Sequence, residues 1–305
     1  MIDEKKFRKR MILAAILLSL FLVSTALVAG CGGPSQAEID FYKEIEIFIN
    51  ETNTSIDQAS QLVSAVGLDE STEVILYGAQ TMDQYVNPGA AGEDRGPSPE
   101  EIQAMATQFD SLTLQLSADL SLPEAPADCA ACGELATKLV DLREQAVSDM
   151  SRGKEVIMTA NAVATARNAE LGEVKAIPIP GAILDLSAAA SPWEAAKGSY
   201  EKALAAYQAI EPSADLKANL DELIAVQQKL IEATQAEINA LNALDDAMMM
   251  QTQDAALNTA SEEIRYFNGL IIHAFEVARE IDDSLQSLSS DVDKLRDEIP
   301  DDLDS

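Results

Sequence analysis

The feature that most constrains the fold is a long apolar seam near the carboxyl end of the chain. From residue 257 to residue 295, apolar residues recur at alternating steps of three and four. This spacing is typical of helices that pack as in a coiled coil, and it predicts one continuous helix from about residue 255 to 297. The seam consists of Leu257, Ala260, Ile264, Phe267, Ile271, Ala274, Ala278, Ile281, Leu285, Leu288, Val292 and Leu295.

A helix of this length can bury its seam only against other long helices, so we predict an all-α, elongated antiparallel helical bundle. Abundant alanine and an aromatic content of only 5% also favour helices over sheets. A second seam, interrupted by the polar Thr52, predicts a helix that ends before Gly67. Capping residues and prolines predict further helices over residues 70–85, 98–119, 128–170, 191–210 and 215–245. Asp128 is expected to cap the third of these helices and Asp215 the last.

The sequence also suggests how the chain is divided. Proline and glycine interrupt an apolar stretch at residues 172–191, which we interpret as a packed connection between two helical halves. The amino-terminal half would cover residues 37–171 and the carboxy-terminal half residues 192–299. Residues 300–305 form an acidic tail.

The first 31 residues carry a targeting signal. Five lysines and arginines within the first ten residues precede an uncharged run from Met11 to Ala29. A basic region followed by an apolar region and small residues is typical of a secretory signal peptide. The segment closes with Ala29, Gly30 and Cys31. It resembles the lipobox of bacterial lipoproteins, although Val28 stands where leucine is more usual.

The resemblance implies that residues 1–30 are removed as a signal peptide and that a diacylglycerol is attached to the Cys31 thiol. Residues 31–36 would then be a short lipidated tether, and the mature chain would lie outside the cytoplasm at the cell membrane or envelope. The uncharged run of 19 residues could instead remain as a membrane helix of about 28 Å. The basic cluster before it would leave the rest of the chain on the same side.

Charge limits the partners of the mature chain. The whole chain has a net charge of −31, and removal of residues 1–30, with five basic and two acidic residues, leaves −34. Such a surface repels nucleic acid and anionic lipid head groups, so we predict no nucleic-acid binding. The membrane would be contacted through the lipid, with envelope proteins as possible partners. The sequence leaves the oligomeric state open.

Cys129 and Cys132 form a C-x-x-C pair at a predicted helix start. Outside the cytoplasm the two thiols should oxidise, so we predict a structural disulfide. A thiol-redox role is the alternative, because a helix amino terminus lowers the pKa of a cysteine. That alternative would need a strand–turn–helix context, which the sequence does not suggest.

No other constellation predicts catalysis, and we expect neither enzymatic activity nor a metal or cofactor apart from the lipid on Cys31. His273 is the only histidine, and Leu270 stands where a di-iron Glu-x-x-His pair would need an acid. Consecutive methionines at 248–250 do not share a helix face, so they are expected to fill space rather than to bind one ion.

Two polar residues interrupt the predicted apolar stripe of the helix over residues 215–245. Gln227 and Thr234 occupy seam positions between isoleucines and leucines. Such residues usually set helix register and the choice of partner helix, but they could also line a small-ligand pocket. The sequence therefore favours a structural or interaction protein of the cell envelope, with a ligand-binding or sensory bundle as the alternative.

Overall fold

The computed structural model describes residues 34–65, 99–117, 122–173, 190–243 and 246–300. Every regular element in these ranges is an α-helix, which confirms the predicted all-α class. The signal segment, the tether up to residue 33, the helix predicted over 70–85, most of the 172–191 connection and residues 301–305 lie outside the described residues. The helices are α2 (Gln36–Ala65), α4 (Pro99–Ser117), α5 (Ala130–Glu173), α6 (Ala190–Gln208), α7 (Lys217–Ala243) and α8 (Asp246–Arg296).

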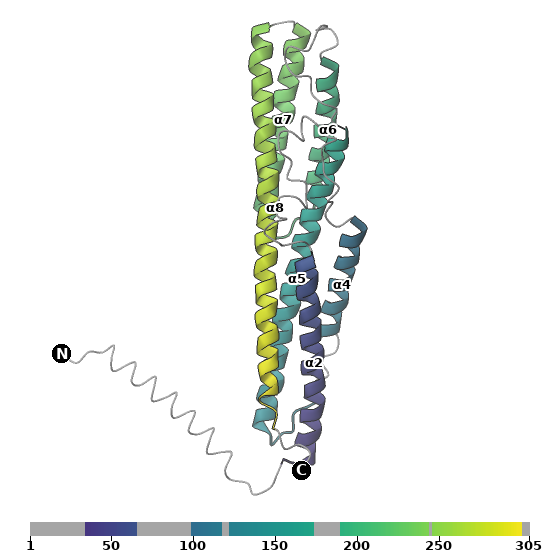
Figure 1. The fold of residues 1–305 in the computed structure, drawn as a ribbon, viewed down its shortest axis with the longest axis vertical. Coiled ribbons are helices and arrows are strands. Elements are labelled where there is room, and N and C mark those ends of the chain that lie inside the picture. The colour runs from purple at the N-terminus through teal and green to yellow at the C-terminus, as the bar shows by residue number, and fades with distance from the viewer. Residues whose placement is uncertain (1–33, 66–98, 118–121, 174–189, 244–245, 301–305) are drawn as a thin grey trace, which may run out of the picture.

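The helices form an elongated bundle in which α8 extends from one end to the other (Figure 1). Its 51 residues correspond to a length of about 76 Å at ~1.5 Å per residue. α2 and part of α5 lie beside the carboxy-terminal part of α8, and α7 lies beside its amino-terminal part. α4 packs against α2 and α5, and α6 packs against α7 and α5. Among the described helices, none is long and apolar enough to cross a membrane.

The predicted seam of α8 faces the interior. Ten of its twelve residues are buried, and the other two, Leu257 and Ile264, are half-buried. The helix begins at Asp246, about nine residues before the predicted start. The added turns contain alanine, methionine and glutamine, which favour helix even though the seam has not yet begun.

Two predicted helix starts differ from the structure in their capping residue. Asp128 was expected to cap α5, but the Sγ atom of Cys129 accepts the Cys132 N–H at 3.2 Å instead. Asp215 was expected to cap α7, but its carboxylate accepts two hydrogen bonds from the Arg152 guanidinium, both at 2.9 Å. In each case a tertiary or local partner competes with the capping role of an acidic side chain.

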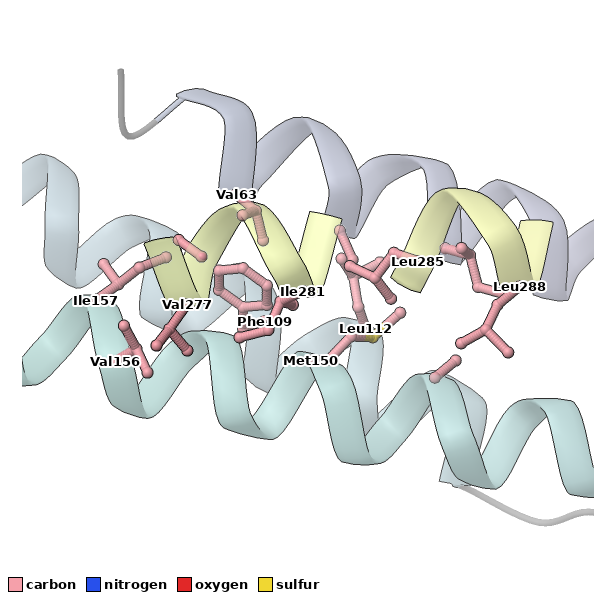
Figure 2. Packing of buried hydrophobic residues seen from close by; sticks show 14 of the residues in the cluster. Val63, Phe109, Leu112, Met150, Val156, Ile157, Val277, Ile281, Leu285 and Leu288 are labelled. Atoms are coloured by element: carbon pink, nitrogen blue, oxygen red, sulfur yellow. The ribbon is translucent and has the colours of Figure 1, made fainter. Parts of the chain in front are cut away.

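The hydrophobic core divides into one large cluster and two small ones. The large cluster joins α2, α4, α5 and the carboxy-terminal part of α8 and reaches the α6–α7 turn. We call this part of the bundle the base, and Figure 2 shows side chains of its four helices in contact. The two small clusters lie between α6, α7 and the start of α8. We call this part, residues 190–200, 230–243 and 246–260, the tip.

Candidate functional site

The sequence placed its candidate polar site at Gln227 and Thr234, and the structure buries both side chains completely. Gln227 donates from Nε2 to the backbone oxygen of Tyr200 on α6 at 3.2 Å. Thr234 donates from Oγ1 to the backbone oxygen of Leu230, one turn earlier on α7, at 2.7 Å. The Gln227 bond joins α7 to α6 and is of the kind that fixes the register of two helices, whereas the Thr234 bond lies within α7.

A buried ion pair lies at the same level of the bundle and was missed in the sequence. Arg167 of α5 and Glu263 of α8 are joined at 2.6 Å, and their side chains are 3% and 0% exposed. The guanidinium also lies over the ring of Phe267, 5.8 Å from its centroid. A desolvated pair of this kind constrains geometry strongly because neither charge can lose its partner without a large cost.

The ion pair and Gln227 mark the boundary between the core of the base and that of the tip. On α7, Gln227 separates Val226 of the large cluster from Leu230 of a small one. On α8, Glu263 separates Phe267 of the large cluster from Ala260 of the same small one. The hydrophobic core is therefore interrupted by polar side chains on both helices at this level.

A second buried carboxyl lies nearer the end of the tip. Glu237 of α7 is 2% exposed, and Thr252 of α8 donates a hydrogen bond from Oγ1 to its Oε2. Burial raises the pKa of Glu237 above its ordinary value, and the hydrogen bond from Thr252 opposes this rise.

The sequence contains a pattern that could have identified the two buried acids, Glu237 and Glu263. Glu263 belongs to a stripe of buried positions seven residues apart on α8, with Ala256, Leu270 and Val277. Glu237 likewise continues the buried stripe of Leu223 and Leu230 on α7. A charged residue inside an apolar heptad stripe is the pattern that would have identified them.

The two cysteines lie at the far end of the base from the tip, next to the start of α2. A disulfide joins Cys129 to Cys132, with the Cα atoms 5.3 Å apart, and both residues are buried. The Tyr42 hydroxyl lies 3.9 Å from the Cys129 sulfur, and burial, with a smaller effect of Glu38, raises the pKa of this tyrosine. A buried sulfur pair packed against α2 is placed to stabilise the start of α5. Its oxidation state in solution stays a prediction.

His273 lies on the side of α8 near the α6–α7 turn. Its Nδ1 is 3.4 Å from a carboxylate oxygen of Glu276, and its side chain is 40% exposed. Nearby, Arg152 pairs with Asp215 and, at 3.6 Å, with Glu280. These pairs hold the α6–α7 turn against α5 and α8. Among the described residues, no group of three or more His, Cys, Asp or Glu could hold a metal ion.

The exposed methionines lie at the end of the tip. Met248 and Met250 are 51% and 73% exposed, while Met249 packs against the outermost small cluster. The three side chains thus point in different directions, as consecutive helical residues must.

Comparison with protein-family models, curated proteins and solved structures gave no significant match for this chain.

Proposed function

We propose that the protein is a lipid-anchored, extracytoplasmic helical spacer with a structural or interaction role in the cell envelope. The observation that carries the proposal is the topology of the bundle. The first residues of α2 and the last residues of α8 lie at the same end of the bundle, and the end of α7 and the start of α8 lie at the other (Figure 1).

The length of the tether determines how far each end of the bundle would lie from the membrane. If Cys31 carries the lipid, only five residues separate it from the Ala37 region, a span of at most ~17 Å. The base would then lie close to the membrane, and the tip would stand roughly 75 Å from it, given ~1.5 Å of rise per helical residue. The described surface is rich in acidic residues and suits contact with soluble or basic partners more than insertion into lipid.

The lipid anchor is tested first, by intact mass of the chain extracted from membranes. We expect residues 1–30 to be absent and a diacylglycerol-type mass to be present on Cys31, and Cys31→Ser to leave an uncleaved precursor. A wild-type chain that retains residues 1–30 would refute the lipoprotein part of the proposal.

The interaction role is tested by site-specific photo-crosslinking in intact cells. A photoreactive residue replaces Gln251, which is exposed in the tip, or Gln286, which is exposed in the base. We expect discrete envelope crosslinks from position 251 that are lost when Cys31→Ser is added. Crosslinks that do not depend on the anchor, or none from either position, would contradict the spacer role.

A further inference from the structure

The buried carboxyl of Glu237 lies in an environment that does not suit a charge. It belongs to α7 beside the outermost small cluster, which contains Trp193 of α6, Ile238 of α7 and Ala256 of α8. The polar group that reaches it is the Thr252 hydroxyl of α8. An ionised carboxylate that is removed from water requires compensation from hydrogen bonds or from an opposite charge.

The Thr252 hydroxyl has one proton and three acceptors within reach. Besides Glu237 Oε2, its Oγ1 lies 2.8 Å from the backbone oxygen of Met248 and 3.3 Å from that of Met249. If Glu237 is ionised, the hydroxyl can donate either to the carboxylate or to a carbonyl. If Glu237 is protonated, it donates to Thr252 Oγ1, and the hydroxyl donates to Met248, so both bonds form. The geometry therefore accommodates the protonated acid better.

We propose that Glu237 holds a proton in the closed tip and acts as an acid-stabilised clasp between α7 and α8, so that loss of this proton loosens the tip. The clasp is local because the core of the tip is separate from that of the base. Opening would expose Trp193 and Met249 next to the already exposed Met248 and Met250. The pH outside the cell would thus set how much apolar surface the far end of the bundle presents.

The surroundings of Glu237 contain no described charge that would substitute for the proton. The charged residues of neighbouring turns, Glu232 of α7, Asp254 of α8 and Glu194 of α6, have exposed side chains. Lys197 of α6 pairs with Glu201 at 2.7 Å. Burial, the larger influence, raises the pKa of Glu237, and the Thr252 hydrogen bond only partly offsets it.

The sign of the pH effect follows from this rise. Between the pKa of the unfolded chain, about 4.3, and the raised pKa of the folded chain, the closed tip binds more protons than the open one. Its stability therefore falls as the pH rises through this window. One proton limits the change to about tenfold in the opening equilibrium per pH unit.

The test is hydrogen exchange of the whole mature chain between pH 5 and 9, corrected for intrinsic exchange rates. In the wild type, the protection factors of tip amides should fall by up to about tenfold per pH unit, while those of α2 and the end of α8 stay constant. Glu237→Gln mimics the protonated acid and should abolish this fall. Glu232→Gln, which removes an exposed charge on the same helix, should retain it. Equal pH dependence in the wild type and Glu237→Gln would overturn the proposal.

A second measurement does not depend on the folding of a variant. The infrared carbonyl band of a protonated carboxylic acid should persist in the folded wild type above pH ~4.3, the pKa of an unfolded glutamate. It should disappear as the pH rises through the raised pKa of the folded chain, and tip protection should stop falling at that point. A wild type in which this band is absent above pH ~4.3, or in which tip protection continues to fall after the band has disappeared, would also overturn the proposal.

Discussion

The base and the tip use the same helical architecture but stabilise it differently. In the base, one large cluster of aliphatic and aromatic side chains connects four helices (Figure 2). In the tip, the core consists of two small clusters. The buried pair of Arg167 and Glu263 lies between them and the core of the base, and Glu237 is buried beside the outermost cluster.

A buried charged side chain is present in the base too, but it bonds to backbone oxygens. Arg143 of α5 donates to the carbonyl oxygens of Leu116 and Gln115 at 3.1 and 3.2 Å, where α4 ends. Burial lowers the pKa of Arg143, and Glu51 opposes this effect. In the tip and at its boundary with the base, by contrast, the buried charged side chains bond to side chains of other helices. The comparison indicates that the large hydrophobic core stabilises the base, whereas the buried polar groups of the tip fix the register of its helices at some cost in stability.

The largest effect is expected from breaking the buried ion pair of the polar boundary. Glu263→Leu leaves the Arg167 guanidinium buried without its carboxylate, which should reduce the free energy of unfolding by about 3–5 kcal/mol. Replacing both residues, as Arg167→Met with Glu263→Leu, should recover most of this loss because no uncompensated charge remains. Chemical denaturation of the three chains measures both changes. A double variant as unstable as the single one would show that the pair contributes more than charge balance.

The next effect concerns the core of the base. Ile281 is fully buried on α8 and touches the position of Gly153 on α5, so Ile281→Ala should cost about 2–5 kcal/mol. Gln286→Ala is the matched control, since Gln286 is exposed and bonds only to Asp282 on its own helix among the contacts described. Melting temperatures compare the two. Equal tolerance of both changes would mean that the seam docks a second chain instead of closing this bundle.

The sequence pattern does not identify a second suitable control. Ser284 lies off the predicted seam of α8, and its position alone suggests a neutral site. The structure shows instead that its hydroxyl donates to Asp149 of α5 at 2.6 Å. Ser284→Ala is therefore expected to cost some stability.

These cases show what a sequence pattern can and cannot predict. The seam of α8 and the interrupted seam of α2 depend on local periodicity, so the helices and their buried faces could be predicted from the sequence. Most helix ends lie within a few residues of the predicted positions. The early start of α8 was missed because residues 246–254 form helix without extending the seam.

The partners of polar side chains were not predictable in the same way. Asp215 resembles a helix cap in sequence, but its partner Arg152 lies 63 residues away, and only the tertiary fold brings them together. Glu263 and Glu237 look like surface acids in a chain with 52 acidic residues. Their burial becomes visible only when the second, parallel stripe of each helix is considered along with the first.

A smaller effect is expected from the disulfide of the base. We expect neither Cys129 nor Cys132 to react with an alkylating reagent in the absence of a reductant, as judged by mass. Replacing both with alanine should cost no more than about 2 kcal/mol, because the bond closes a very short loop and removes little entropy from the unfolded chain. Reductase activity that Cys129→Ala abolishes would revive the redox alternative.

The smallest effect, and the one that contrasts the two regions most directly, comes from Asp215. The hydrogen bond from Arg152 is the largest cause of a lowered pKa for this carboxyl, with burial acting against it. Its contribution to stability is therefore fully present above the unfolded pKa of about 3.9 and is lost as the pH falls through the lowered value of the folded chain. Because the side chains of Arg152 and Asp215 are partly exposed, at 40% and 25%, Asp215→Asn should cost only about 0.2–1 kcal/mol near neutral pH.

Asp221→Asn is the control, since the pair of Asp221 with Lys217 is more exposed and lies within one helix. Melting temperatures from pH 7 down to pH 3 should fall less steeply in Asp215→Asn than in the wild type and Asp221→Asn. This acid-sensitive contact in the base is opposite in sign to the proposed acid-stabilised clasp at Glu237. If Asp215→Asn had the same acid dependence as the wild type, the lost stability at low pH would have to come from other carboxylates, and the turn between α6 and α7 would not link pH to the base.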